Sequence, residues 1–94
     1  MKVTWSRRAL RHLVYLRRRI DKDSEQNAAL VAGRILDAVE LLQKHPEIGR
    51  PGRVVGTREL VVPETPYVIP YRVRGQRLEL IAVFHGRQKW PHKL

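Results

Sequence analysis

The segment TRELVVPETPYVIPYRVRGQRLELIAVF, residues 57–84, has the two-residue apolar period of β-strands. Three runs rich in β-branched and aromatic residues are separated by two turn-forming stretches. The runs cover residues 57–62, 67–73 and 77–84, and the turns cover 63–66 and 74–76. Short connections join antiparallel neighbours, so the segment predicts a three-stranded antiparallel meander, with the last run apolar enough to be a central strand. Pro70 has no N–H to donate and is expected at an edge or a bulge.

The N-terminal part of the chain changes to the period of an amphipathic helix. After a short strand at residues 2–5, Ser6 can cap a helix that extends from Arg7 to about Asp21. Its apolar stripe consists of Leu10, Leu13, Leu16 and Ile20, with Ala9 and Val14 alongside. Its opposite face is basic and carries Arg7, Arg8, Arg11, Arg18 and Arg19.

A second helix follows the polar stretch DKDSEQN, residues 21–27. Asp23, with Gln26 three positions on, resembles a capping box, and the helix is expected to extend to about Lys44 because Pro46 prevents its continuation. Its apolar stripe consists of Ala28, Val31, Ala32, Ile35, Val39 and Leu42, widened by Leu36 and Leu41. The short break between the two helices predicts an antiparallel helical hairpin.

Helices followed by strands indicate an α+β fold. We expect a short N-terminal strand, an antiparallel helical hairpin and a three-stranded meander that form one sheet with the helices packed on one face. The 94 residues are enough for a single domain, 1–94, with one core. There is no cysteine and no apolar core of signal-peptide length, which predicts a cytoplasmic setting. No run approaches the about 20 apolar residues of a membrane span.

Positive charge is the dominant property of the composition. Nineteen Lys and Arg against nine Asp and Glu give a formal net charge of +10. Such a field favours polyanionic partners, namely nucleic acid, the ribosome or an acidic protein segment. A solvated basic surface is the plainer interpretation of the same charge.

The stretch HGRQKW, residues 85–90, places several functional side chains just after the last strand. Cleavage of RNA by its own 2′-hydroxyl needs proton transfer and positive charge around the phosphate, and His85 and Arg87 could supply these. Trp90 could stack on an unpaired base, or pack on the sheet as a plug. Lys89 adds a further cation for target binding.

Two other groups of arginines are candidates for contact with nucleic acid or another target. Arg50, Arg53 and Arg58 lie in a Gly-rich loop that either touches nucleic acid or simply connects helix to strand. Arg72 and Arg74 alternate with Tyr71 and Val73, so they are expected on the open face of the sheet, where Arg72 would hold phosphate. We expect no metal, since His12, His45, His85 and His92 lack ligand spacing, and no cofactor.

Three segments together resemble the RelE/ParE family of toxins from bacterial type II toxin–antitoxin modules. They are HPEIGRPGRVVGTRELVV, YVIPYRV and LELIAVFHGRQKWP, at residues 45–62, 67–73 and 78–91. The resemblance extends over essentially the whole chain and implies the fold expected above. It also implies a growth-inhibiting toxin that a cognate antitoxin neutralises with a flexible C-terminal segment, in a toxin–antitoxin hetero-oligomer.

The family resemblance implies two alternative targets, because fold does not decide function. RelE-like members cut mRNA on the ribosome, whereas ParE-like members poison DNA gyrase without catalysis. Arg87 matches an arginine that RelE-like nucleases keep after the last strand, and His85 lies close to a histidine position of some relatives. Val68 and Gly52 stand where nucleases place an arginine or a glutamate, and Trp90 does not match the terminal aromatic acid/base.

These observations lead to three functional hypotheses. The first is an mRNA-cleaving toxin in which Arg87, His85 and Arg72 act together, without metal. The second is a gyrase poison, and the third is a non-toxic nucleic-acid-binding module. For either toxin, an antitoxin with an acidic or amphipathic C-terminal segment is the expected partner.

Overall fold

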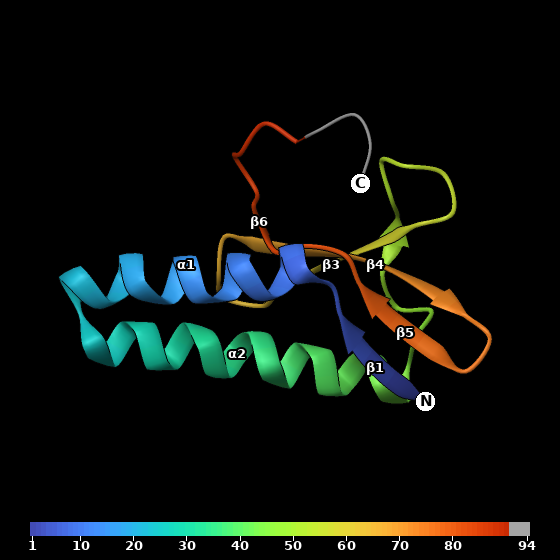
Figure 1. The fold of residues 1–94 in the computed structure, drawn as a ribbon, viewed down its shortest axis with the longest axis horizontal. Helices are drawn as coiled ribbons and strands as arrows, with labels where there is room; N and C mark the ends of the chain where they lie inside the picture. The colour runs from blue at the N-terminus through green and yellow to red at the C-terminus, as the bar shows by residue number, and fades with distance from the viewer. Residues whose placement is uncertain (91–94) are drawn as a thin grey trace.

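The computed structural model describes residues 1–90. Two helices precede most of the sheet, which confirms the predicted α+β fold (Figure 1). The helices are α1 (Arg7–Asp23) and α2 (Glu25–Lys44), and they lie antiparallel as a hairpin. The strands are β1 (Lys2–Trp5), β2 (Arg50–Pro51), β3 (Arg58–Val61), β4 (Tyr67–Arg74), β5 (Arg77–Leu80) and β6 (Phe84–His85).

The predicted meander is present as β3, β4 and β5, which pair antiparallel in sequence order. The whole sheet has the order β1-β5-β4-β3-β2, and β6 also pairs with β4. Strand β1 lies parallel to β5, so the sheet is mixed, and β5 has a neighbour on both sides as expected of a central strand. The short strand β2 was not expected from the sequence, and β6 is a separate strand at the end of the third predicted run.

Pro70 explains why the third apolar run is not one continuous strand. Strand β5 ends at Leu80 and β6 begins at Phe84, and both pair with β4 on the same side. Pro70 lies between these two ladders, and its carbonyl accepts the N–H of Ile81 at 2.9 Å. Because Pro70 has no N–H to return, the ladder is interrupted there. The predicted position of this proline at a bulge-like irregularity is therefore confirmed.

The boundaries of the helices differ from the sequence expectation at one point. Ser6 caps α1 as predicted, with its Oγ accepting the N–H of Ala9 at 2.9 Å. The N-cap of α2 is Ser24 and not Asp23, so the predicted capping box is wrong. The Oγ of Ser24 accepts the N–H of Asn27 at 3.1 Å, and the extended backbone of Ser24 also ends α1. A single residue thus closes one helix and opens the next.

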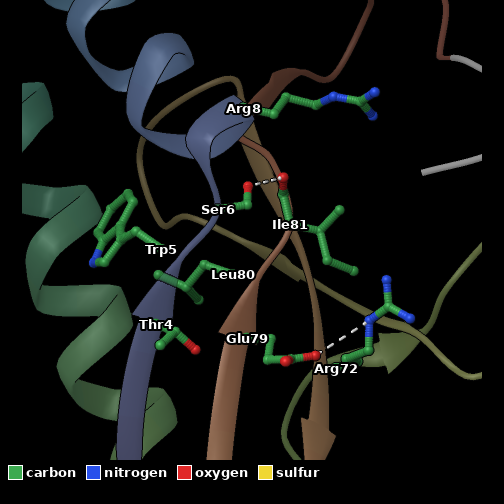
Figure 2. A pocket seen from close by; sticks show the side chains of 8 residues that line it. All are labelled: Thr4, Trp5, Ser6, Arg8, Arg72, Glu79, Leu80 and Ile81. Atoms are coloured by element: carbon green, nitrogen blue, oxygen red, sulfur yellow. Dashed lines mark hydrogen bonds and ion pairs between the residues drawn. The ribbon is translucent and has the colours of Figure 1, made fainter.

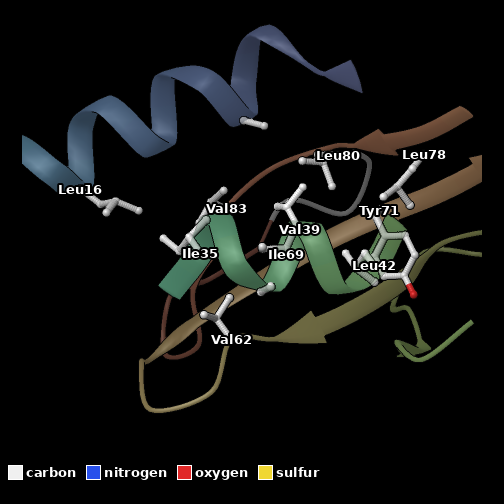
Figure 3. Close-up of a cluster of buried hydrophobic side chains, with 12 residues drawn as sticks. Leu16, Ile35, Val39, Leu42, Val62, Ile69, Tyr71, Leu78, Leu80 and Val83 are labelled. Carbon is white, nitrogen blue, oxygen red and sulfur yellow. The ribbon is translucent and has the colours of Figure 1, made fainter. Parts of the chain in front are cut away.

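The core lies between the helical hairpin and one face of the sheet (Figure 3). It contains Leu16 of α1, Ile35, Val39 and Leu42 of α2, and Ile69, Tyr71, Leu78 and Leu80 of the sheet. Four residues of the predicted stripes are instead about half exposed: Leu10, Val14, Leu36 and Leu41. They lie at the flanks of their helices, since a sheet contacts only a narrow stripe of each helix. Neither helix is both long and apolar enough to cross a membrane, among the residues described.

Candidate functional site

The segment after β5 forms a tight turn around His85. Strand β6 places His85 opposite Tyr67 and Phe84 opposite Val68 of β4. The Nδ1 atom of His85 accepts the N–H of Arg87 at 3.1 Å, so the neutral imidazole carries its proton on Nε2. The ring also meets Tyr67 edge-on, with centroids 5.6 Å apart. The structure thus brings His85 and Arg87 together, as the sequence suggested.

Arg72 lies elsewhere on the sheet. Its partner in the ladder is Glu79 of β5, and its Nε is 3.6 Å from the Glu79 carboxylate, which also receives Arg74 at 3.4 Å. His85 is opposite Tyr67, five residues before Arg72, which is about 16 Å at roughly 3.3 Å per residue. Directly opposed residues share a face, so His85 lies on the side of Tyr67, which packs against the core under the helices. Arg72 is an odd number of residues from Tyr67 along β4, so it points to the opposite face. The structure does not bring Arg72 to His85 and Arg87.

The arginines of the loop before β3 are held by Glu59. This carboxylate is only 3% exposed, and it accepts Arg50 Nη2 at 3.2 Å and the backbone N–H of Arg53 at 2.8 Å. Arg58 donates instead to the carbonyls of Glu47 and Gly49, at 3.1 and 2.8 Å. Buried carboxylates require such partners. These contacts position the loop itself, so the plainer interpretation of a helix-to-strand connection accounts for most of this group.

Trp90 packs against the sheet on the face away from the helices. Its ring lies 4.6 Å from that of Phe84, between centroids, and the guanidinium carbon of Arg53 lies 3.7 Å from the centroid of the Trp90 ring. The indole is therefore contacted by both an apolar ring and a cation, and the contact with the cation is favourable. In this position Trp90 serves as the plug of the two predicted alternatives, and a base could stack on it only after Arg53 moves. Lys89 is exposed.

A cleft of about 580 Å³ lies between α1 and the β4–β6 edge, and His85 lines it together with His12 and Tyr67. The Nδ1 atom of His12 accepts the N–H of Val83 at 3.1 Å, at the point where the ladder is interrupted. From the sequence, His12 was considered only as a possible metal ligand. No local pattern indicates that it accepts a hydrogen bond from Val83, which lies far along the chain. Within residues 1–90 no group of three His, Asp or Glu side chains could hold a metal ion, and His92 lies outside the described residues.

The His12 contact predicts a pH dependence of stability. Burial, and then the charges of Arg8 and Arg11, lower the pKa of His12 below its usual 6.5. Below pH 6.5 the unfolded chain therefore binds a proton that the folded chain resists, and stability falls as the pH drops to the folded pKa. Replacing His12 with Gln should flatten this part of the stability profile, as measured by urea unfolding from about pH 5 to pH 8. Parallel profiles for both proteins would contradict the assignment.

Comparison with known proteins gives three consistent similarities. Residues 3–90 match the family model described as "ParE toxin of type II toxin-antitoxin system, parDE". A protein of Sinorhizobium fredii (strain NBRC 101917 / NGR234), named "Putative toxin Y4kP", is 44% identical over 93 residues, which are 99% of this chain and 96% of that protein. A solved structure of the chromosomal ParDE toxin–antitoxin system from P. aeruginosa superposes with a TM-score of 0.83 at 25% identity, covering 90% of this chain and 95% of that one.

Proposed function

Since the chain belongs to the ParE toxin family of type II toxin–antitoxin systems, we propose that it inhibits growth by binding and poisoning DNA gyrase, without itself catalysing a reaction. The family match favours this target over the mRNA that RelE-like members cut. A toxin of this kind needs a shaped contact surface and positive charge, and it needs no proton donor or acceptor aligned on a phosphate.

The observation that carries the proposal is the separation of the groups that RNA cleavage would require. Arg72 lies about 16 Å along β4 from the position of His85. RNA cleavage needs the proton-transferring group and the cation that holds the phosphate within reach of the same reacting atoms. Arg72 is also engaged by Glu79, and Trp90 offers no titrating proton near neutral pH. This geometry supports a binding role for these residues rather than a catalytic one.

The remaining surface suits a partner that combines protein and DNA. The net charge of +10 favours a polyanionic target, and gyrase carries DNA during its reaction. Arg87 and Lys89 are exposed and follow the turn at His85, where the backbone N–H of Arg87 is hydrogen-bonded, so both side chains reach solvent. We assign these two residues to target contact.

A cognate antitoxin is the second partner of the proposed function. The half-exposed Leu10 and Val14 lie on α1 beside its arginines, so an amphipathic segment with acidic residues would find both apolar and charged partners there. Charge steering predicts that the association rate falls as salt increases. An association rate that is the same at low and high salt would contradict this part of the proposal.

Expression in bacteria tests the function in cells. Induction of the chain should stop growth and activate an SOS reporter, because stalled gyrase–DNA complexes become DNA breaks, and co-expression of the neighbouring antitoxin gene should restore growth. A matched variant, Arg87→Gln with Lys89→Gln, should reduce toxicity while the protein stays folded. Growth arrest without SOS induction, accompanied by mRNA cleavage, would favour the RelE-like mode instead. Unimpaired growth would support the non-toxic binding module.

A further inference from the structure

The face of the sheet away from the helices carries an ordered set of cations at its β1–β5–β4 end. In the ladders, Lys2 is paired with Arg77 and Arg77 with Arg74, which makes one row across three strands. Two residues further along, Thr4 is paired with Glu79 and Glu79 with Arg72, which makes a second row on the same face. The helix-facing neighbours Val3, Leu78 and Leu80 belong to the core, which confirms that both rows point the other way.

Arg8 projects from the first turn of α1 at one end of this face, beyond Ile81, and points away from Arg72 (Figure 2). The sequence placed it among the solvated arginines of the helix, yet it lines a pocket of about 380 Å³ with Thr4, Arg72, Glu79 and Ile81. Ser6 fixes the start of α1 here, because its hydroxyl donates to the carbonyl of Ile81 at 2.6 Å. The pocket therefore joins a helix end to the second row of the sheet.

Two polar atoms of this pocket are buried without a hydrogen-bond partner among residues 1–90: Nη1 of Arg8 and Oγ1 of Thr4. Leaving a buried donor unpaired is costly, more so when it is charged, and such groups call for a ligand. Glu79, a carboxylate that lines the pocket, is already shared by Arg72 and Arg74. The first turn of α1 contains no acidic residue, so the positive end of the helix dipole adds to the field.

We infer that this pocket binds the phosphate backbone of a nucleic acid strand, with Arg8 and Arg72 contacting phosphates at its two ends and Thr4 as a further donor. Lys2, Arg74 and Arg77 would contact neighbouring phosphates. A guanidinium pairs well with a phosphate through two N–H groups, and the row of three cations beside the pocket continues the charge in one direction, as a phosphate backbone requires. A single carboxylate of a partner protein could bind in the pocket, but it would make no contact with the row formed by Lys2, Arg77 and Arg74. The inference goes beyond the proposed action on gyrase and does not depend on it.

Binding of the purified protein to a short fluorescein-labelled DNA duplex, followed by anisotropy at several salt concentrations, tests the site. Arg8→Gln and Arg72→Gln should each weaken binding about 10-fold and reduce the magnitude of the salt slope by about one. Arg18→Gln removes the same charge from an exposed position of the same helix and should change the affinity by less than about 2-fold. The double variant at Arg8 and Arg72 should lose about the sum of the two losses in binding free energy, since the two side chains contact separate phosphates.

Stability and competition distinguish the alternatives. Because Nη1 of Arg8 has no partner within the described part of the chain, Arg8→Gln should leave the Tm unchanged or raise it, and inorganic phosphate at constant ionic strength should raise the Tm of the parent protein alone. A lower Tm for Arg8→Gln would mean a structural role and overturn the inference. Equal losses of DNA affinity for Arg8→Gln and Arg18→Gln would show that only the overall positive charge matters, which would overturn the inference. If polyglutamate displaces the labelled duplex as effectively as unlabelled DNA does, the pocket would be assigned to protein carboxylates and the inference would be overturned.

Discussion

Replacing Tyr71 with alanine is expected to lower the free energy of unfolding by about 3–5 kcal/mol, a large part of the roughly 5–15 kcal/mol of a small domain. Tyr71 is fully buried in the core between β4 and α2. Its hydroxyl accepts the N–H of Gly49 at 2.9 Å and donates to the carbonyl of Pro46 at 2.7 Å. One side chain thus fills the core and also fixes the loop that leaves α2.

The conservative variant Tyr71→Phe separates these two roles. It keeps the ring but removes the partner of the buried N–H of Gly49 and of the partly buried carbonyl of Pro46, so a loss of about 1–3 kcal/mol is expected in urea unfolding. Burial raises the pKa of Tyr71, so the neutral phenol that donates to Pro46 is maintained over the working range of pH. Tyr67→Phe is the matched control, since the hydroxyl of Tyr67 makes no hydrogen bond within residues 1–90, and it should cost less than about 0.5 kcal/mol. Equal stabilities of the two phenylalanine variants would contradict the role given to the hydroxyl.

The second large effect is expected at Glu59, whose loss should both destabilise the loop and weaken toxicity. Glu59→Ala leaves the N–H of Arg53 without its acceptor, which should cost about 1–3 kcal/mol. Arg53 is then no longer held over Trp90, and the plug on the open face of the sheet loosens. The segment that carries Arg87 and Lys89 would lose its support, so target contact should weaken along with stability.

Fluorescence can follow this coupling directly. In a Trp5→Phe background Trp90 is the remaining indole, and acrylamide should quench it more readily after Glu59→Ala. Glu64→Ala removes a carboxylate from an exposed ion pair with Arg34 and serves as the control, with an expected cost below about 1 kcal/mol. Unchanged quenching in the Glu59 variant would show that Arg53 does not hold Trp90 in place.

Local patterns predicted the helices and the meander because each depends on neighbouring residues. Alternation between residues 57 and 84, and the three-to-four-residue spacing before it, reflect which side of each element is buried. The partner of β1 did not follow from such a pattern, because the parallel pairing of Lys2–Trp5 with Arg77–Leu80 depends on how the hairpin folds back. The N-cap moved from Asp23 to Ser24 because both residues can cap, and the geometry of the tight hairpin selects one.

The candidate site was less predictable because side chains of one type serve different purposes. His85 and Arg87 are neighbours in sequence and in space, so their association followed from the sequence. Arg72 and Arg8 required the register of three strands and the entry of α1 before they could be placed in one pocket. Arg58 looked like a target contact, yet it donates to two loop carbonyls. The composition showed that the protein is strongly basic, and the fold was needed to show which arginines are already bound to groups of the protein itself.

The most direct test of the proposed mechanism compares two reactions of the same purified protein. One contains DNA gyrase, ATP and supercoiled plasmid, and the other contains ribosomes translating a defined mRNA. The account predicts stabilised gyrase–DNA cleavage complexes, seen as linear plasmid after detergent and protease, and intact mRNA at the same protein concentration. Cleaved mRNA together with normal gyrase activity at saturating protein would contradict it.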